Sequence, residues 1–204
     1  MGLVEGIHFF LRHDEIQLLA KKKFDTRLEK VRDLFLMSCY CGLRYSDLIS
    51  LKPIHVQNGM ITKIAVKTNE FVKIPVIPQL QLLFNKYWTH GKGLPQITNQ
   101  KGNEYLKELA KDAELTREFN YVQKKNKKSI ETTYLAWQMM SWHVARHSFI
   151  TNCIQFGVPQ EVVRRVVGHS SFQTLKKYIQ NDDDYNKIEM MKMSKKIKIN
   201  SSKN

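Results

Sequence analysis

The chain carries, in short blocks, the side chains that an enzyme needs to attack a phosphodiester without a metal ion. Arginines can hold two phosphate oxygens at once, a tyrosine hydroxyl can attack phosphorus, and a lysine or histidine can move the proton. The candidates are two arginines, a lysine, two histidines and a tyrosine: Arg44, Lys67, His143, Arg146, His169 and Tyr178. Their types indicate metal-free chemistry on a nucleic-acid backbone.

The first arginine stands just after a glycine that suits the end of a helix. Arg44 belongs to the string Gly-Leu-Arg-Tyr-Ser-Asp-Leu at residues 42–48, where a guanidinium could bind two phosphate oxygens. A lone arginine in such a place is more often an ordinary surface residue. His143 and Arg146 are three residues apart on one predicted helix and therefore share a face. For this second block the plain alternative is a capped helix end with satisfied polar side chains.

His143 and His147 are four residues apart, a spacing that could also bind zinc. The segment reads His-Val-Ala-Arg-His, without the glutamate after the first histidine that the metalloprotease motif uses as its base. We therefore expect no metal ion at this site and no cofactor for the chain.

The lysine and the tyrosine each have rivals. Lys67 falls at the turn of a predicted hairpin, where a lysine is usually solvated, and Lys63 and Lys73 stand in the same hairpin. A single tyrosine on a helix, such as Tyr178, is more often a packing residue with a wet hydroxyl. Tyr185 is the rival nucleophile, but it follows three aspartates, whose charge repels a phosphate.

All four blocks, in this order, closely resemble the catalytic domain of tyrosine recombinases, or phage-type integrases. Residues 42–48 match the family's first arginine block, and residues 143–146 match its His-x-x-Arg block. Lys67-Thr68 followed by Val-Lys-Ile-Pro at 72–75 is similar to the family's lysine hairpin. His169 in Gly-His-Ser-Ser, nine positions before Tyr178, resembles the last block. The resemblance covers about residues 10–178 and looks closest to integrases of mobile elements, those of the Bacteroides type among them.

The resemblance implies a role for each residue of the site. Tyr178 would attack the scissile phosphate, forming a 3′-phosphotyrosine and freeing a 5′-hydroxyl. Arg44 and Arg146 would stabilise the charge of the transition state. Lys67 would be the general acid for the departing 5′ oxygen, and His143 would assist proton transfer. His169 would donate a hydrogen bond to a non-bridging oxygen, and Asp47 would orient the catalytic groups.

The charge balance indicates a polyanionic partner. The chain has 33 Lys and Arg against 19 Asp and Glu, a formal net charge of +14, and nucleic acid is the commonest partner of so basic a protein. We predict double-stranded DNA, and the resemblance adds self-association, as a tetramer on DNA in the full-length protein and a monomer as a fragment. A basic run expected at a hairpin tip or loop facing solvent or DNA comprises Lys124, Lys125, Lys127 and Lys128.

Nothing in the sequence indicates a membrane or a secretory route. The cysteines Cys39, Cys41 and Cys153 have no disulfide or zinc spacing and are expected to be buried apolar residues. No apolar run approaches the length that spans a bilayer, and charged residues interrupt any signal-like segment at the N-terminus. We therefore expect a bacterial, cytoplasmic, DNA-associated protein without a membrane partner.

Hydrophobic periodicity predicts a mostly α protein with one small antiparallel β-sheet, an α+β class, and the resemblance implies the tyrosine-recombinase catalytic-domain fold. Helices are expected after an N-cap at Asp14 and over about Thr26–Cys41, 46–51, Pro78–Trp88, 103–113, 142–156 and 159–167, followed by one carrying Tyr178 and one over 185–193. Strands are expected over 60–66 and 71–76, on either side of the Lys67 turn, and residues 118–135 are ambiguous.

We expect one catalytic domain over residues 1–204, with a core at about 10–180 and a C-terminal helix and basic tail at 181–204. The N-terminal core-binding domain that family members usually carry is not expected in this chain. Two alternatives fit the same residues. One is the same chemistry used as a type IB topoisomerase or a telomere resolvase, which the topology of the substrate would distinguish, and the other is a non-catalytic DNA-binding module. The full residue set argues against the module, because a binder has no need of a tyrosine at that spacing.

Overall fold

The computed structural model describes residues 9–66, 71–89, 91, 93–125, 128–168 and 191. Its helices are α1 (His13–Lys21), α2 (Thr26–Cys41), α3 (Tyr45–Ile49), α4 (Pro78–Trp88), α5 (Asn99–Asp112), α6 (Ala136–Met139), α7 (Trp142–Gln155) and α8 (Gln160–Val167), with a 3-10 turn η1 (Pro53–His55). Its strands are β1 (Val56–Gln57), β2 (Met60–Ile64), β3 (Phe71–Pro75), β4 (Glu118–Lys125) and β5 (Lys128–Leu135). The mostly helical class is confirmed.

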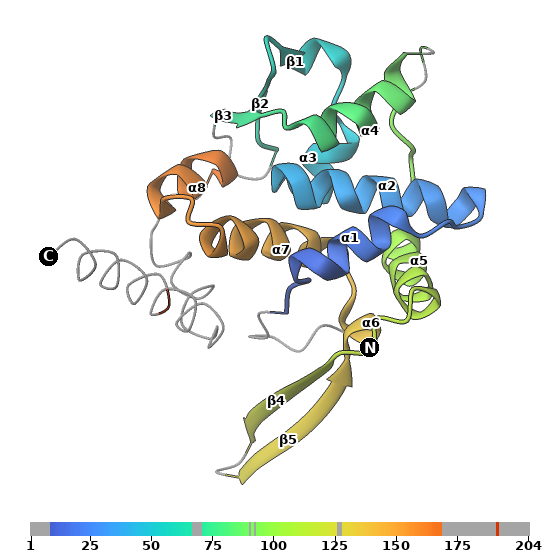
Figure 1. Cartoon of the computed structure of the whole chain (residues 1–204), viewed down its shortest axis with the longest axis vertical. Helices are drawn as coiled ribbons and strands as arrows, with labels where there is room; N and C mark the ends of the chain where they lie inside the picture. The colour runs from blue at the N-terminus through green and yellow to red at the C-terminus, as the bar shows by residue number, and fades with distance from the viewer. Residues whose placement is uncertain are drawn as a thin grey trace, which may run out of the picture.

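Helix α2 is the centre of the molecule, in contact with α1, α3, α4, α5 and α7 (Figure 1). The carboxylate of Asp25 caps its start by accepting a 2.8 Å hydrogen bond from the Leu28 amide. Gly42 ends it in the left-handed conformation, with φ of +69°. Because α2 is buried on most faces, it carries apolar residues nearly all round, as a core helix must. Its predicted bounds and its C-cap glycine are confirmed.

A three-stranded antiparallel sheet, in the order β1-β2-β3, lies beside α4 (Figure 1). Asn58 and Gly59 both have positive φ, 51° and 71°, the turn geometry that their sequence predicts. Ile61 pairs with Ile74, and both are buried, so one face of the sheet joins the core. Within the described residues β2 ends at Ile64 and β3 ends at Pro75, slightly shorter than expected.

The ambiguous segment is a second antiparallel sheet, so that the described chain has two sheets rather than the one expected. Strands β4 and β5 pair from Glu118↔Leu135 to Lys125↔Lys128, and they project as a ribbon from the helical body (Figure 1). Lys124, Lys125 and Lys128 therefore lie on its outer end, as the prediction of a basic hairpin tip required. Lys127 lies outside the described residues.

Two helices begin at residues other than the expected ones, because capping hydrogen bonds set their first residues. Helix α1 begins at His13 after Arg12, whose amide donates a 2.8 Å hydrogen bond to Glu15, so the expected cap at Asp14 is wrong. Helix α5 begins four residues before the expected Asn103, because the Thr98 hydroxyl accepts from the Lys101 amide. Helices α7 and α8 each lie within one residue of their expected bounds.

Two further expectations concern burial. The thiols of Cys39 and Cys41 are buried and that of Cys153 is partly buried, as expected of apolar cysteines. In the described part of the chain, no helix combines the length and the apolar character that crossing a membrane requires.

Candidate active site

The corner between α2 and α3 presents the first arginine. Gly42 reverses the chain there, and a Cβ added to it would lie 2.5 Å from Cδ1 of Phe149 on α7, so only glycine fits this close approach. Arg44, two residues on, is the N-cap residue of α3 and is half-buried. Its guanidinium has no ion pair or side-chain hydrogen bond to any residue that the structure describes. Arg44 is therefore a half-buried cation suited to an external anion.

The second arginine joins three parts of the site. Arg146 is 3% exposed and donates from Nη1 to the Gly42 carbonyl at 2.7 Å and from Nη2 to the Val167 carbonyl at 2.6 Å. The first bond reaches the corner that carries Arg44. The second reaches the last turn of α8, which ends at Gly168 in the left-handed conformation, immediately before His169. Arg146 thus connects its own block to the first block and to Val167, two residues before His169.

Burial also keeps a neighbouring thiol neutral. It raises the pKa of Cys41 to about 12, although the charge of Arg146 acts in the opposite direction. At neutral pH the thiol is therefore protonated and does not neutralise the guanidinium beside it.

Asp47 connects the corner to the lysine hairpin. Its carboxylate is 1% exposed, and Oδ1 accepts a 2.8 Å hydrogen bond from the Val66 amide. Val66 is the residue directly before Lys67, which lies outside the described residues. Within the described residues this carboxylate makes no other hydrogen bond. Its one bond holds Val66, the residue before Lys67, against α3.

The two rival lysines are occupied elsewhere. Lys63 donates a 2.5 Å hydrogen bond to the hydroxyl of Ser50 at the end of α3. Lys73 lies on the exposed side of β3, with Nζ 5.7 Å from the centre of the Phe71 ring. Lys67 remains the prediction for the general acid.

The two histidines of α7 differ in exposure. His143 is exposed and His147 is buried, and their ring centres are 4.4 Å apart at an interplanar angle of 66°. A ring nitrogen of His147, Nδ1, lies 3.3 Å from the Phe9 carbonyl oxygen. Among the described residues no three His, Cys, Asp or Glu side chains gather as metal ligands would.

The segment before α1 is hydrogen-bonded to α7. The Leu11 amide donates to Ser148 Oγ at 2.8 Å, and its carbonyl accepts from Asn152 Nδ2 at 2.9 Å. On the other side, Arg117 donates to the Phe10 carbonyl at 2.7 Å and to Glu15. The first two bonds attach this segment to α7, the helix of His143 and Arg146, and the Arg117 bonds hold the segment in turn.

Sequence reasoning missed the residues that fix the first turn of α7. The Trp142 indole stacks on Tyr45, with ring centres 4.3 Å apart and planes at 20°. It also lies against Gly102, where a Cβ would be 2.5 Å from the indole, and its amide donates to Asn103 Oδ1 at 2.9 Å. The available signal was adjacency, because Tyr45 follows Arg44 and Trp142 precedes His143.

The structure therefore brings four predicted residues to neighbouring positions where α2, α3, α7 and α8 meet: Arg44, Asp47, His143 and Arg146. The predicted Lys67, His169 and Tyr178 lie outside the described residues, although the chain reaches the first two at Val66 and Gly168. The basic ribbon end projects from another side of the helical body (Figure 1).

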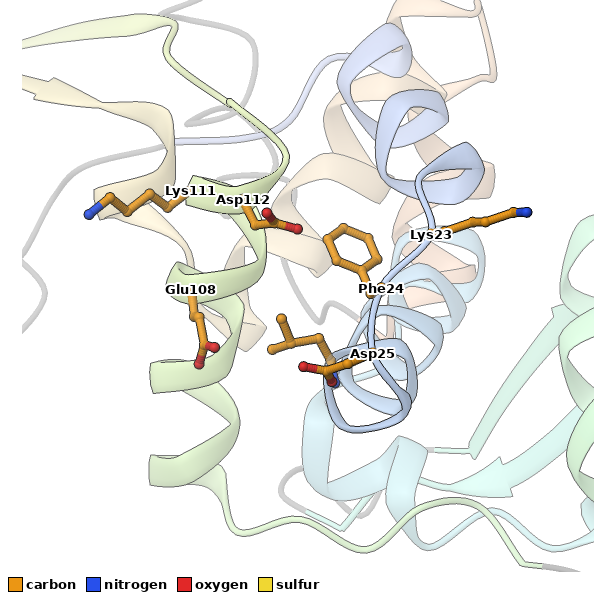
Figure 2. A pocket seen from close by; sticks show the side chains of 7 residues that line it. Lys23, Phe24, Asp25, Glu108, Lys111 and Asp112 are labelled. Carbon is orange, nitrogen blue, oxygen red and sulfur yellow. The ribbon is translucent and has the colours of Figure 1, made fainter.

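A pocket of about 730 Å³ lies elsewhere, between the α1–α2 connection and α5 (Figure 2). Its lining residues are Lys23, Phe24, Asp25, Leu28, Glu108, Lys111 and Asp112. It adjoins the first turn of α2, whereas Arg44 follows the last. At 1.5 Å per residue, the 16 residues of α2 separate these two ends by about 24 Å. The pocket is therefore not part of the arginine site.

Solved structures share this architecture. The Tn1549 transposon integrase in complex with transposon right end DNA has a TM-score of 0.65 and 16% identity, over 92% of this chain and 67% of that one. The catalytic domain of bacteriophage HP1 integrase has a TM-score of 0.57 and 19% identity, over 83% of this chain and 86% of that one. The fold is therefore that of tyrosine-recombinase catalytic domains.

The sequence places the chain within that class. Residues 10–185 match the phage integrase family, and the chain belongs to this family. It is 25% identical over 144 residues to the tyrosine recombinase XerC of Rickettsia prowazekii, covering 68% of this chain and 43% of that protein. It is 26% identical over 164 residues to the tyrosine recombinase XerD of Yersinia pestis, covering 79% and 53%. The chain thus spans about half the length of these two relatives.

Proposed function

We propose that this chain is the catalytic domain of a site-specific DNA recombinase that integrates or excises a mobile element. The observation that carries the proposal is the pair of hydrogen bonds from Arg146 to the Gly42 and Val167 carbonyls. They join the guanidinium of the second block to Gly42, at the start of the first block, and to Val167, two residues before His169. A structural arginine needs no second arginine nearby, and Arg44 has no carboxylate partner among the described residues to explain its half-buried position.

The proposed reaction is a transesterification at phosphorus. The Tyr178 oxygen forms a bond to the scissile phosphorus and its proton passes to His143, while the bond to the 5′ oxygen breaks. Lys67 gives the departing 5′ oxygen its proton. The 3′-phosphotyrosine stores the energy of the phosphodiester, so a second 5′-hydroxyl can reseal the strand without ATP.

The cations supply the electrostatic part of this catalysis. Arg44 and Arg146 hold the non-bridging oxygens while negative charge grows in the transition state. The two carbonyl hydrogen bonds of Arg146 fix its guanidinium beforehand, which avoids reorganisation during the reaction. His169 donates a hydrogen bond to one of those oxygens. Asp47 holds Val66, the residue before Lys67, against α3 by accepting from its amide.

The proposed partner is double-stranded DNA in a bacterial cytoplasm, with self-association on that DNA. The net charge of +14 supports a polyanionic partner. The basic run Lys124, Lys125, Lys127 and Lys128 would give the DNA backbone a second contact, and its described members lie at the end of the β4–β5 ribbon. Because phosphate contacts release counterions, the affinity for DNA should fall steeply between low and moderate salt. An affinity that does not change over that range would contradict a DNA ligand.

A covalent-adduct assay tests the chemistry. The wild-type chain, Tyr178→Phe and Tyr185→Phe are each incubated with supercoiled plasmid in EDTA, and adducts stable in SDS are measured together with relaxed topoisomers. We expect adducts with the wild type and with Tyr185→Phe, and none with Tyr178→Phe, whose affinity for DNA should stay within about threefold because it keeps every phosphate contact.

Other outcomes have definite meanings. Adducts retained in Tyr178→Phe would refute the assigned nucleophile. Relaxation by the wild type without exchange between two marked DNA molecules would favour a type IB topoisomerase. Intact DNA binding with no adduct from any variant, even after fusion to a core-binding domain, would favour a non-catalytic DNA-binding module.

A further inference from the structure

One aromatic contact joins the neighbours of two site residues. Tyr45 directly follows Arg44, and Trp142 directly precedes His143. The two rings stack at 4.3 Å, although the residues are 97 positions apart in the chain, and both side chains are buried. The stack is therefore a direct side-chain contact between the residue after Arg44 and the residue before His143.

Each ring is also held by a contact outside the stack. The Tyr45 hydroxyl donates to the Ile97 carbonyl, which holds the phenol against the segment that precedes α5. The indole of Trp142 lies on the bare backbone of Gly102, and the Trp142 amide is held by Asn103 of the same helix. The stack thus has little room to slide, because Gly102 of α5 lies against the indole and Ile97 holds the phenol.

The backbone at each end transmits this constraint to the neighbouring residue. Tyr45 and Trp142 are the first residues of α3 and α7, so their rings set where each helix starts. Arg44 is the N-cap of α3, and His143 is the second residue of α7. A displaced ring therefore moves the backbone from which the adjoining arginine or histidine side chain extends.

We propose that Tyr45 and Trp142 are positioning residues that set the separation of Arg44 and His143 for the reaction. This inference rests on the function proposed above. Arg44 must hold the phosphate while His143 takes the proton of the attacking hydroxyl, and a misplacement of about 1 Å can lower such a rate about 100-fold. The stack fixes this separation before DNA binds, which is the property that preorganised catalysis requires.

The test compares Trp142→Leu with Trp142→Phe, and both with a matched control. Phe84 and Trp88 of α4 form a second stack, also at 4.3 Å and with planes at 13°, away from the arginine site. Trp88→Leu therefore removes a stack of the same geometry and should affect folding alone. Each variant is assayed for the single-turnover rate of adduct formation and for DNA affinity, at a temperature well below its unfolding midpoint.

We expect Trp142→Leu to lower the adduct rate about 100-fold with DNA affinity within about threefold. Trp142→Phe, which retains a ring to stack on Tyr45, should recover most of the rate, and Trp88→Leu should leave it unchanged. Equal rates for Trp142→Leu and Trp88→Leu would overturn the proposal. So would a failure of Trp142→Phe to exceed Trp142→Leu.

A second measurement separates this inference from the proposed function. The ring signals of His143 are followed by NMR in the free chain, where no catalysis is needed. Trp142→Leu should shift them and Trp88→Leu should not. If the wild type forms no adduct, the proposed function fails on its own, and unchanged His143 signals in Trp142→Leu would then overturn the positioning role independently.

Discussion

Replacing Gly42 by alanine should destabilise the protein by about 2–5 kcal/mol, through two separate physical costs. Gly42 has φ of +69°, and an L-residue in that conformation costs about 1–2 kcal/mol. A Cβ there would also lie 2.5 Å from Cδ1 of Phe149, and overpacking of this kind costs about 1–3 kcal/mol. The substitution therefore tests how closely the end of α2 packs on α7 beside the Arg44 corner.

Two other glycines separate these costs. Gly59 has φ of +71° but nothing within 4 Å of an added Cβ, so Gly59→Ala should cost only the backbone part, about 1–2 kcal/mol. Gly102 has an ordinary backbone, but a Cβ would lie 2.5 Å from the Trp142 indole, so Gly102→Ala should cost only the packing part, about 1–3 kcal/mol. Gly42→Ala should exceed both.

Urea unfolding followed by circular dichroism measures all three. The urea midpoint should fall furthest for Gly42→Ala and less for Gly59→Ala and Gly102→Ala. The slope of the free energy against urea concentration should not change, because the surface exposed on unfolding stays the same. In a Phe149→Ala background, Gly42→Ala should cost no more than Gly59→Ala, because the clash has gone. If Gly42→Ala costs no more than Gly59→Ala even with Phe149 present, the close contact of α2 with α7 is refuted.

Two further predictions concern a buried carboxylate and buried thiols. Asp47→Ala should destabilise the protein by about 1–3 kcal/mol, because it leaves the Val66 amide unpaired. Asp47→Asn should cost less, since it keeps an acceptor. If the Val66 amide is equally protected from hydrogen exchange in the wild type and in Asp47→Ala, this prediction is wrong. Burial raises the pKa of Cys41 to about 12 and that of Cys153 to about 11, from 9.0. The unfolded chain therefore loses these protons first, and the free energy of unfolding should fall as pH rises from 9 to 12. Urea titrations across that range should show a shallower fall for Cys41→Ala, and a flat wild-type profile would refute the shifts.

Local signals in the sequence predicted the elements that local interactions decide. The bounds of α2 follow from Asp25 before it and Gly42 after it, and α4 starts at Pro78, whose fixed φ suits a first helical position. The turn at Asn58-Gly59 needs positive φ at two residues and was likewise predictable. The types of the candidate site residues were also visible, because each block is short and continuous in the chain.

Contacts between distant segments decided what the sequence left open. Residues 118–135 were ambiguous because two strands stabilise each other only across the ribbon, from Glu118↔Leu135 onward. Helix α5 starts four residues before the expected Asn103, and Gly102 lies inside it, where its missing side chain makes room for Trp142.

The site divides in the same way. The sequence by itself determined which residues can hold a phosphate and move a proton, since that depends on side-chain chemistry alone. Only the tertiary structure decided that Arg146 is buried and holds the Gly42 carbonyl, 104 residues away, while His143 on the same helix is exposed. It also decided that Tyr45 stacks on Trp142. Such bonds depend on how helices pack, and packing is a property of the whole folded chain rather than of any one segment.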